Sequence, residues 1–93
     1  MTDLKQDKKD QATAVAQLVQ LMAYLRDPEH GCAWDRKQTL SSLTRHTLEE
    51  VYEVIDAVEQ GDSVKICDEL GDLLFQVVFY ARIAEESGSF DLG

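Results

Sequence analysis

The sequence predicts an all-α fold, a bundle of about three helices. Two observations support this prediction: apolar residues recur at helical spacing along three segments, and residues that favour helix ends stand at the boundaries of these segments. The alternating pattern of a half-buried strand is missing from the sequence. With 93 residues and a single proline, the chain is expected to form one domain, residues 1–93. Its core is small, so a partner subunit would help to stabilise it.

The first helix is predicted to run from about Gln11 to Arg26 and to end before Pro28. Residues 1–10 are polar, and we expect them to form a frayed N-terminus. Residues 27–38, DPEHGCAWDRKQ, are predicted to be a loop that carries the only tryptophan. The apolar residues that define the first helix are Ala14, Val15, Leu18, Leu21, Met22 and Leu25.

The second helix is predicted to begin near Thr39 to Ser42, because both of these residues favour the N-cap position, and to stop at Gly61, a natural C′ residue. Asp62 or Ser63 is expected to cap a third helix, which runs to about Ser87. The turn between these two helices is therefore very short, and short turns join antiparallel neighbours.

The charge of the chain excludes some classes of partner. A net charge of -9 argues against binding to nucleic acid or to an acidic membrane, because phosphate-rich surfaces need clustered Lys and Arg. The polar N-terminus lacks the apolar region of a signal peptide, and no apolar run approaches the roughly 20 residues of a membrane span. We therefore expect a cytoplasmic protein. Cys32 and Cys67 match no metal-binding spacing and are expected to be reduced thiols.

The second predicted helix carries carboxylates along one flank of its apolar face. At about 100° per residue, that flank holds Glu49, Glu53 and Asp56, and Glu50 lies beyond Glu53. Like charges at this spacing cost a few tenths of a kcal/mol (about 0.2–0.5) per pair. An acidic helix face is usually just solvated, so this helix alone predicts no site. The apolar face consists of Leu48, Val51, Tyr52, Ile55 and Val58.

The third predicted helix is apolar almost all round, except for one narrow strip. The strip holds Lys65, Glu69, Asp72 and Gln76, at positions i, i+4, i+7 and i+11. Carboxylates on a nearly buried helix need compensation, because unpaired buried charge is costly. The chain has only nine Lys and Arg residues to provide it. This strip therefore calls for another source of positive charge.

Two antiparallel helices joined by the turn GDS can bring Glu50 and Glu53 opposite Glu69 and Asp72. Four carboxylates that converge on one point favour a hard divalent cation, and Mg²⁺ is the obvious occupant. The sequence therefore predicts a Mg²⁺ site with these four ligands, in which the cation relieves the repulsion between the acids.

The same third helix predicts association. It would be about 37 Å long at roughly 1.5 Å per residue, and two other helices can shield only two of its sides. Phe75 and Phe79 are therefore expected to face water in a monomer. We expect a homodimer or a higher homo-oligomer that buries this surface and completes a four-helix-type bundle.

Three motifs in this order resemble the MazG-type nucleoside triphosphate pyrophosphohydrolases. EEVYE, followed sixteen residues after Glu53 by ELGD, is similar to the EExxE…ExxD signature of that family. LRDPEHGCAWDRKQT resembles the loop before it, and DLLFQVVFYARIAEESGSFDL resembles the continuation. The resemblance covers the chain from about residue 18. It implies an all-α fold, a tight dimer, dependence on Mg²⁺, and hydrolysis of nucleoside triphosphates to a monophosphate and pyrophosphate.

The resemblance also implies roles for single residues. Glu50, Glu53, Glu69 and Asp72 match the metal ligands of the family, and Glu49 matches the first acid of the motif. Glu49 would ligate a second ion or orient the attacking water, and both roles stay open. Ala33 departs from the family, which usually has proline in this loop. The chain stops at Gly93, whereas family domains continue into a further helix and a basic segment, so we expect a fragment that lacks this helix.

Several other residues are candidates for binding the nucleotide. Trp34 is expected either to stack on a base or to anchor the loop, and Asp35 and Gln38 either to read base edges or to cap the second helix. Lys37 is a candidate for contacting phosphate, with a solvated surface charge as the alternative. The same two alternatives hold for Arg36, Arg45 and Lys65. His46 is expected to be a surface residue bonded to a carboxylate rather than a catalytic one.

One rival function comes from another class of protein. The chain could be a non-catalytic helical module of a larger protein, which binds nucleotide or metal for dimerisation or regulation. Retention of all five acids favours the enzyme, because a dimerisation module would gain stability by replacing them. A di-iron carboxylate bundle would require Glu-x-x-His pairs, which this sequence lacks.

Overall fold

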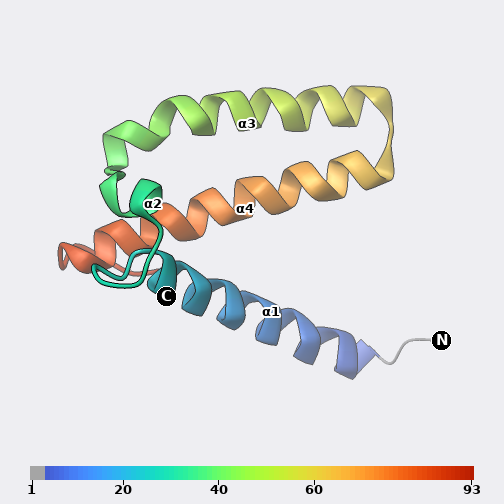
Figure 1. The fold of residues 1–93 in the computed structure, drawn as a ribbon. Coiled ribbons are helices and arrows are strands. Elements are labelled where there is room, and N and C mark those ends of the chain that lie inside the picture. The colour runs from blue at the N-terminus through green and yellow to red at the C-terminus, as the bar shows by residue number, and fades with distance from the viewer. Residues whose placement is uncertain (1–3) are drawn as a thin grey trace. The chain divides into compact units, whose positions relative to one another are not determined.

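The computed structural model describes residues 4–93, with side chains from Asp10 onward. These residues form four helices: α1 (Leu4–Leu25), α2 (Ala33–Lys37), α3 (Leu40–Gln60) and α4 (Ser63–Glu86) (Figure 1). No strand occurs within this part of the chain, which confirms the all-α class. Across residues 4–93, none of the helices combines the length and the apolar character that crossing a membrane requires. The chain forms two compact units, Met1–Arg36 and Lys37–Gly93, and each is described by itself.

Helix α1 begins at Leu4, several residues before the predicted start at Gln11. The segment between these two residues contains no Gly or Pro and consists of Lys, Gln and Asp. Lys and Gln propagate a helix at little cost even without apolar periodicity. The periodic pattern thus marks where the helix packs, with Met22 fully buried, rather than where it begins.

The predicted loop after α1 contains a short helix, α2, so the prediction of a loop throughout residues 27–38 was wrong. Asp27 Oδ1 accepts hydrogen bonds from the backbone N–H groups of Glu29 and His30, at 2.8 and 2.9 Å, and these bonds lower the pKa of Asp27. The chain then turns at Gly31. Beyond it, the N–H of Arg36 bonds to the carbonyl of Cys32 at 3.0 Å, which closes one helical turn where no Gly or Pro interrupts.

Gly31 is required by space rather than by a special backbone angle. A Cβ atom at this position would lie 2.2 Å from the carbonyl oxygen of Leu25 and 2.7 Å from that of Asp27. Neither backbone oxygen can move freely, because the N–H of Cys32 bonds to Leu25 at 2.8 Å and the N–H of Gly31 bonds to Asp27 at 3.0 Å. Gly31 therefore allows the chain to fold back tightly between α1 and α2.

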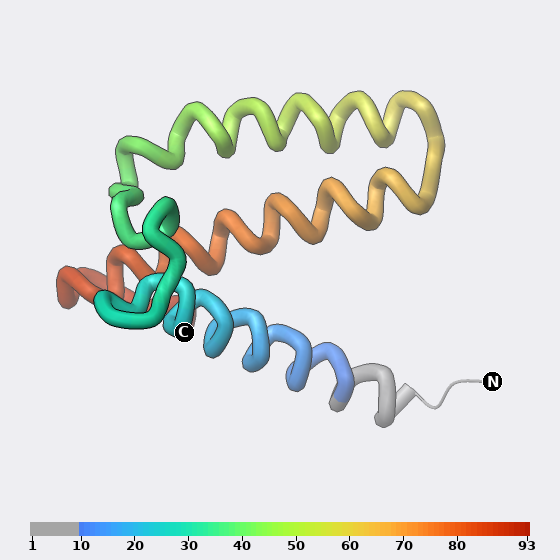
Figure 2. Tube along the Cα trace, viewed as in Figure 1, coloured from blue at the N-terminus to red at the C-terminus, as the bar shows by residue number. Residues whose placement is uncertain are grey.

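Helices α3 and α4 lie side by side as an antiparallel hairpin (Figure 1). Thr39 caps α3: its Oγ1 accepts from the N–H of Ser42 at 3.1 Å, and Ser42 Oγ accepts from the N–H of Thr39 at 2.8 Å. At the other end, Gly61 adopts the left-handed conformation, with φ of 72°. Asp62 Oδ1 then caps α4 by accepting from the N–H groups of Val64 and Lys65. The predicted ends of both helices are confirmed, and the tight turn between them is seen in Figure 2.

Two cross-helix hydrogen bonds tie α3 to α4 near the start of α3. The hydroxyl groups of Thr47 and Tyr80 lie 2.6 Å apart, and Gln76 Nε2 donates to the carbonyl oxygen of His46 at 3.2 Å. The buried apolar residues of this unit come from both helices. These residues are Leu43, Ala57, Val78, Phe79, Ala81 and Ala84.

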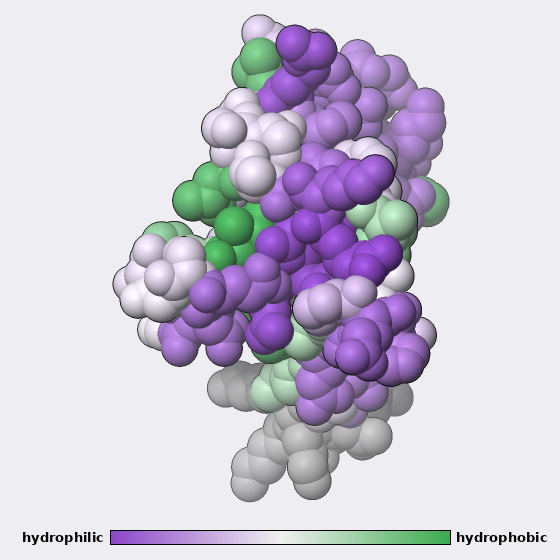
Figure 3. Space-filling model, turned by 60° about the vertical axis from the view of Figure 1, so that its left-hand side comes forward, coloured by the Kyte–Doolittle hydropathy of each residue, from purple (hydrophilic) through white to green (hydrophobic). Residues whose placement is uncertain are grey.

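Phe79 does not face water, so the prediction that it forms the exposed surface was wrong. Its exposed fraction is 1%, and its ring meets the ring of half-buried Phe75 edge to face, with centroids 6.2 Å apart. Other large apolar residues are exposed instead: on α3 they are Leu40, Leu48, Val51, Tyr52, Ile55 and Val58, and on α4 they are Val64, Leu70, Leu74 and Val77. Figure 3 shows hydrophobic patches among mainly hydrophilic residues on one face of the molecule.

Gly31, in the bend before α2, and Gly71, inside α4, differ in whether they tolerate a methyl group, which gives a matched pair of substitutions. Gly31→Ala should lower the free energy of unfolding by about 1–3 kcal/mol, as expected for overpacking against atoms that cannot move. Gly71→Ala, in α4 with nothing within 4 Å of the added carbon, should raise it by about 0.5–1 kcal/mol. Urea unfolding followed by the emission of Trp34 measures both, and equal effects would contradict this account.

Candidate metal centre

Two acidic residues, one on α3 and one on α4, occupy positions where the two helices face each other. Along both helices, buried or half-buried positions recur every three or four residues, the spacing of the core positions of a helical pair. They are Leu43, Thr47, Glu50, Val54 and Ala57 on α3, and Ile66, Glu69, Leu73, Gln76 and Tyr80 on α4. Glu50 and Glu69 belong to these sets, whereas Glu53 and Asp72 are exposed beside them. Carboxylates therefore stand where a helical hairpin usually places apolar side chains.

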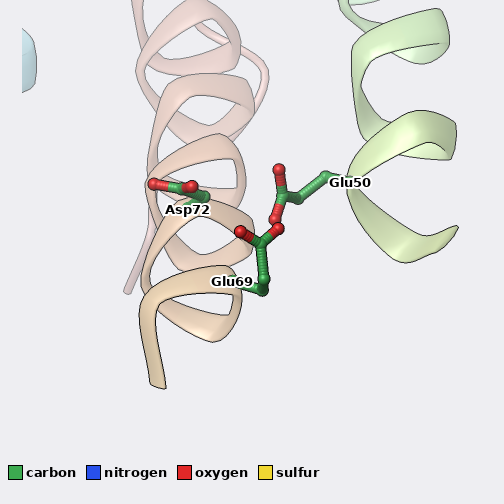
Figure 4. Close-up of side chains that lie close together, drawn as sticks. All are labelled: Glu50, Glu69 and Asp72. Atoms are coloured by element: carbon green, nitrogen blue, oxygen red, sulfur yellow. The ribbon is translucent and has the colours of Figure 1, made fainter. Parts of the chain in front are cut away.

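Three of the four predicted ligands come together. Carboxylate oxygens of Glu50, Glu69 and Asp72, one from each residue, all lie within 4.8 Å of one another. In Figure 4, Glu50 reaches from α3 toward α4 and its carboxyl group lies beside that of Glu69, while Asp72 projects from α4 further along the helix. Glu50 is buried, Glu69 is half-buried and Asp72 is exposed, so the cluster is open to solvent on one side.

Glu53 is not part of this close group, although the sequence placed it there. It is exposed, and the neighbouring carboxyl of Glu69 is the main cause that raises its pKa. Glu53 and Glu69 also line an open pocket of about 310 Å³ at the surface of the hairpin. The other residues that line it are Asp56, Ala57, Lys65 and Asp68.

Burial and like charge make the centre unfavourable without a cation. Burial is the largest cause that raises the pKa of Glu50 to about 7, followed by the adjacent carboxyl of Glu69 and the charges of Glu53 and Asp72. No basic side chain is among the causes of this shift. Burial and the neighbouring carboxyl groups thus disfavour the ionised form of Glu50, so ionising it in the folded state costs stability.

The oxygens of the centre fit a divalent cation. Glu50 Oε1 and Glu69 Oε2 are buried and have no hydrogen-bond partner among the described residues, a situation that costs about 1–3 kcal/mol per group when nothing compensates it. All the donors are hard carboxylate oxygens, the ligands that Mg²⁺, Ca²⁺ and Mn²⁺ prefer. A cation between α3 and α4 would satisfy the orphaned oxygens and cancel the repulsion together.

The remaining predicted site residues have different environments. Glu49 is exposed on α3, beside Glu50 in sequence. In the first unit, Trp34 is 50% exposed on α2, whereas Asp35 is buried and its carbonyl accepts from Arg26 Nη1 at 2.7 Å. Lys37 is exposed.

Gln38 lies beside the N-cap of α3, where its Oε1 accepts from Ser42 Oγ at 2.8 Å. This contact agrees with the alternative that Gln38 helps to cap α3, because Ser42 is the second residue of the capping box.

Two features of the centre had no role in the sequence-based prediction. Asp68 lines the same pocket as Glu53 and Glu69, although only its place next to Glu69 in sequence pointed to it. Gln76 was recognised as part of the polar strip of α4 without a function, yet its Oε1 is a third buried acceptor with no partner among the described residues. The polar strip of α4 therefore indicated the right residues, but it did not indicate a function for Gln76.

The fold and the site define a class of protein, all-α with a carboxylate centre between two antiparallel helices. Comparison with known proteins gives the family. The family model of the MazG nucleotide pyrophosphohydrolase domain matches residues 38–93, which include all of α3, α4 and the acidic centre. The chain belongs to this family.

Similar proteins carry consistent names. The chain is 53% identical over 77 residues to the nucleoside triphosphate pyrophosphohydrolase of Escherichia coli (strain K12), a match that covers 83% of the chain and 29% of that protein. It is 46% identical over 84 residues to the nucleoside triphosphate pyrophosphohydrolase/pyrophosphatase MazG of Thermotoga maritima, with 90% and 32% covered. The nucleoside triphosphate pyrophosphohydrolase of Mycobacterium tuberculosis is 46% identical over 70 residues, with 75% and 22% covered. The chain thus spans about a third or less of the relatives it matches.

The raised pKa of Glu50 predicts how stability depends on pH in the metal-free protein. Glu50 titrates near 7 when folded, against an ordinary value of 4.5, so the folded state holds this proton more tightly. Its stabilising contribution is fully present below about pH 4.5 and is lost as the pH rises through about 7. The urea midpoint in EDTA should therefore fall between pH 5 and pH 8, and Glu50→Gln should remove most of this fall. Parallel curves for the two proteins would show that Glu50 is not the group responsible.

Proposed function

We propose that this chain is a Mg²⁺-dependent nucleoside triphosphate pyrophosphohydrolase domain, which releases a nucleoside monophosphate and pyrophosphate. The observation that carries the proposal is the approach of the Glu50, Glu69 and Asp72 oxygens within 4.8 Å of one another, in a chain of the MazG family. The names of the similar proteins support the substrate class. A strongly acidic protein can bind a triphosphate only if cations come between its carboxylates and the phosphates.

In this proposal, Glu50, Glu69 and Asp72 hold Mg²⁺, and Glu53 joins them from the edge of the pocket. When bound, Mg²⁺ neutralises phosphate oxygens and lowers the pKa of a water near the α-phosphorus. The acids fix this charge between two rigid helices, so little reorganisation is needed during the reaction. Water forms a bond to the α-phosphorus, the bond from this phosphorus to the bridging oxygen breaks, and pyrophosphate leaves.

Lys65 is proposed to contact the phosphates, in addition to the candidate Lys37. It lines the same pocket as Glu53 and Glu69, and its Nζ donates only a weak, exposed hydrogen bond to Gln60 Oε1 at 3.3 Å. A flexible, exposed ammonium group can turn toward an anionic ligand at little cost. Glu49 is proposed to orient the attacking water or to bind a second ion. Its side chain is exposed on α3, next to Glu50 in sequence, and is therefore accessible to water and ions.

Trp34 is proposed to contact the base of the nucleotide. Trp34 offers a half-exposed indole, and stacking on an aromatic side chain contributes about 1–3 kcal/mol per base. Asp35 and Gln38 stay candidates for reading base edges, and Lys37 for a phosphate. Support for Asp35 and Gln38 is weaker than for Trp34, because Asp35 is buried and Gln38 contacts Ser42.

A homodimer is the proposed form of the protein. The apolar residues of α3 that lie away from the acids are exposed, with Tyr52 at 63%, Leu48 at 56% and Val58 at 55%. Burying a large apolar side chain contributes about 1.5–3 kcal/mol, so several together favour association. A symmetric pair is the simplest assembly, since the same surface serves both subunits.

The activity assay uses the whole chain with Mg²⁺ and each common nucleoside triphosphate in turn. Pyrophosphate should appear with the wild type, and Glu69→Gln should reduce kcat/KM by about 100-fold or more, above the roughly 10–100-fold that supporting residues of a metal site contribute. Glu59→Gln is the matched control, because it removes the same charge from an exposed position on α3 and should leave the rate unchanged.

The same assay distinguishes the enzyme from the rival, a binding module without catalysis. A binding module would change the emission of Trp34 saturably when nucleotide and Mg²⁺ are added, yet it would release no pyrophosphate. That result would refute the proposed hydrolysis, and the proposed metal centre would survive it. Equal rates for the wild type and Glu69→Gln would refute the centre itself.

Association is measured by light scattering at low micromolar concentration. The wild type should show twice the 10.5 kDa mass of one chain, and Tyr52→Asp should shift the protein toward a monomer because it places a charge in the exposed apolar surface of α3. Val64→Asp changes a more exposed residue at the first turn of α4, off that surface, and should leave the mass unchanged. A wild type with the mass of one chain would contradict the proposal.

A further inference from the structure

Gln76 occupies the position between the apolar part of the α3–α4 contact and the carboxylate centre. On α4 it lies one turn beyond Asp72, and on α3 it faces His46, one turn before Glu50. The next inward positions are Leu43 and Phe79, both fully buried. A polar side chain at such a boundary is costly unless both of its ends find partners.

Only one end of the Gln76 amide has a partner within the described residues. Nε2 donates to the carbonyl oxygen of His46 at 3.2 Å. That carbonyl is also the helical acceptor for the N–H of Glu50, four residues on. The bond therefore attaches α4 to the turn of α3 that carries Glu50. The other end, Oε1, is buried without a hydrogen-bond partner, like Glu50 Oε1 and Glu69 Oε2.

The three orphaned atoms share one chemistry, because all are acceptors. Carboxylates can bind a cation directly, but a neutral amide oxygen one turn away needs a donor. A hydrated divalent cation supplies both, since Mg²⁺ keeps several of its waters when it binds to protein carboxylates. A neutral amide also adds no further negative charge to a centre in which Glu50 and Glu69 already lie side by side (Figure 4).

We propose that Gln76 is a positioning residue of the metal centre: its amide N–H fixes the turn that carries Glu50, and its carbonyl oxygen accepts a hydrogen bond from a water bound to the cation. This inference rests on the proposed metal centre and adds a residue outside the acidic motif. Gln76 acts through that water and through the backbone of α3, without touching the cation.

Two substitutions separate the two ends of the side chain. Gln76→Met keeps the length and flexibility of the side chain but removes both donor and acceptor. Gln76→Glu keeps an acceptor oxygen and removes the donor to His46. Calorimetric titration of each purified chain with MgCl₂ at pH 8, without nucleotide, measures the cation affinity independently of activity.

Gln76→Met should weaken Mg²⁺ binding about 10-fold, the lower end of the effect of residues that support metal ligands. Gln76→Glu should bind within about threefold of the wild type or more tightly, because its oxygen replaces the amide carbonyl. Tyr80→Phe is the control: it removes a cross-helix hydrogen bond between the same helices, so its urea midpoint should fall while its Mg²⁺ affinity stays unchanged.

The outcomes distinguish the inference from the proposed function. If the wild type binds no Mg²⁺, the metal centre fails and this inference fails with it. If the wild type binds Mg²⁺ and Gln76→Met binds it equally, only the role of Gln76 is refuted. Equal loss in Gln76→Met and Gln76→Glu would also refute the role of the carbonyl oxygen, because it would leave Gln76 as a simple link between helices. Circular dichroism of each variant confirms that the compared chains are folded, and if Gln76→Met does not fold, Gln76→Leu replaces it.

Discussion

The approach of Glu50 to Glu69 is the constraint that the rest of the α3–α4 hairpin has to accommodate. Oxygens of these residues and of Asp72 lie within 4.8 Å of one another, and two of the oxygens are buried without a partner in the described chain. Apolar side chains at these positions would make the helical pair more stable, since removal of buried charge is often neutral or favourable. The middle of the hairpin is therefore destabilised by its carboxylates, and contacts elsewhere in the unit must offset this cost.

The two ends of the hairpin supply this stability and fix its register. At one end, the left-handed Gly61 and the Asp62 cap make the turn so short that the helices have little freedom to slide. At the other end, Leu43 and Phe79 are buried, and the hydroxyls of Thr47 and Tyr80 meet at 2.6 Å. Because inward positions repeat every three or four residues, a slip of one residue would turn the acids away from each other. The tight turn and the apolar end prevent it.

The acidic inner face also explains why so much apolar surface lies outside. Glu50 occupies a buried position of α3 at the contact with α4, so Leu48, Tyr52 and Ile55 fall on the opposite side of α3 and are exposed. A small chain buries only part of its unfolded surface, and here its own helices leave the outer face of α3 uncovered. Association would then restore the apolar burial that the centre displaces, which links the proposed dimer to the proposed metal centre by one physical cause.

The sequence by itself determined the ends of α3 and α4, because caps such as Thr39, Gly61 and Asp62 act on neighbouring backbone groups. It also showed which strip of α4 is polar, because helical spacing fixes the side of the helix on which a residue lies. Only the tertiary structure decided that Phe79 is buried, that Glu53 stands outside the close group and that Gln76 links the two helices. These facts depend on how two helices are rotated and registered against each other, and the spacing within either helix does not specify that.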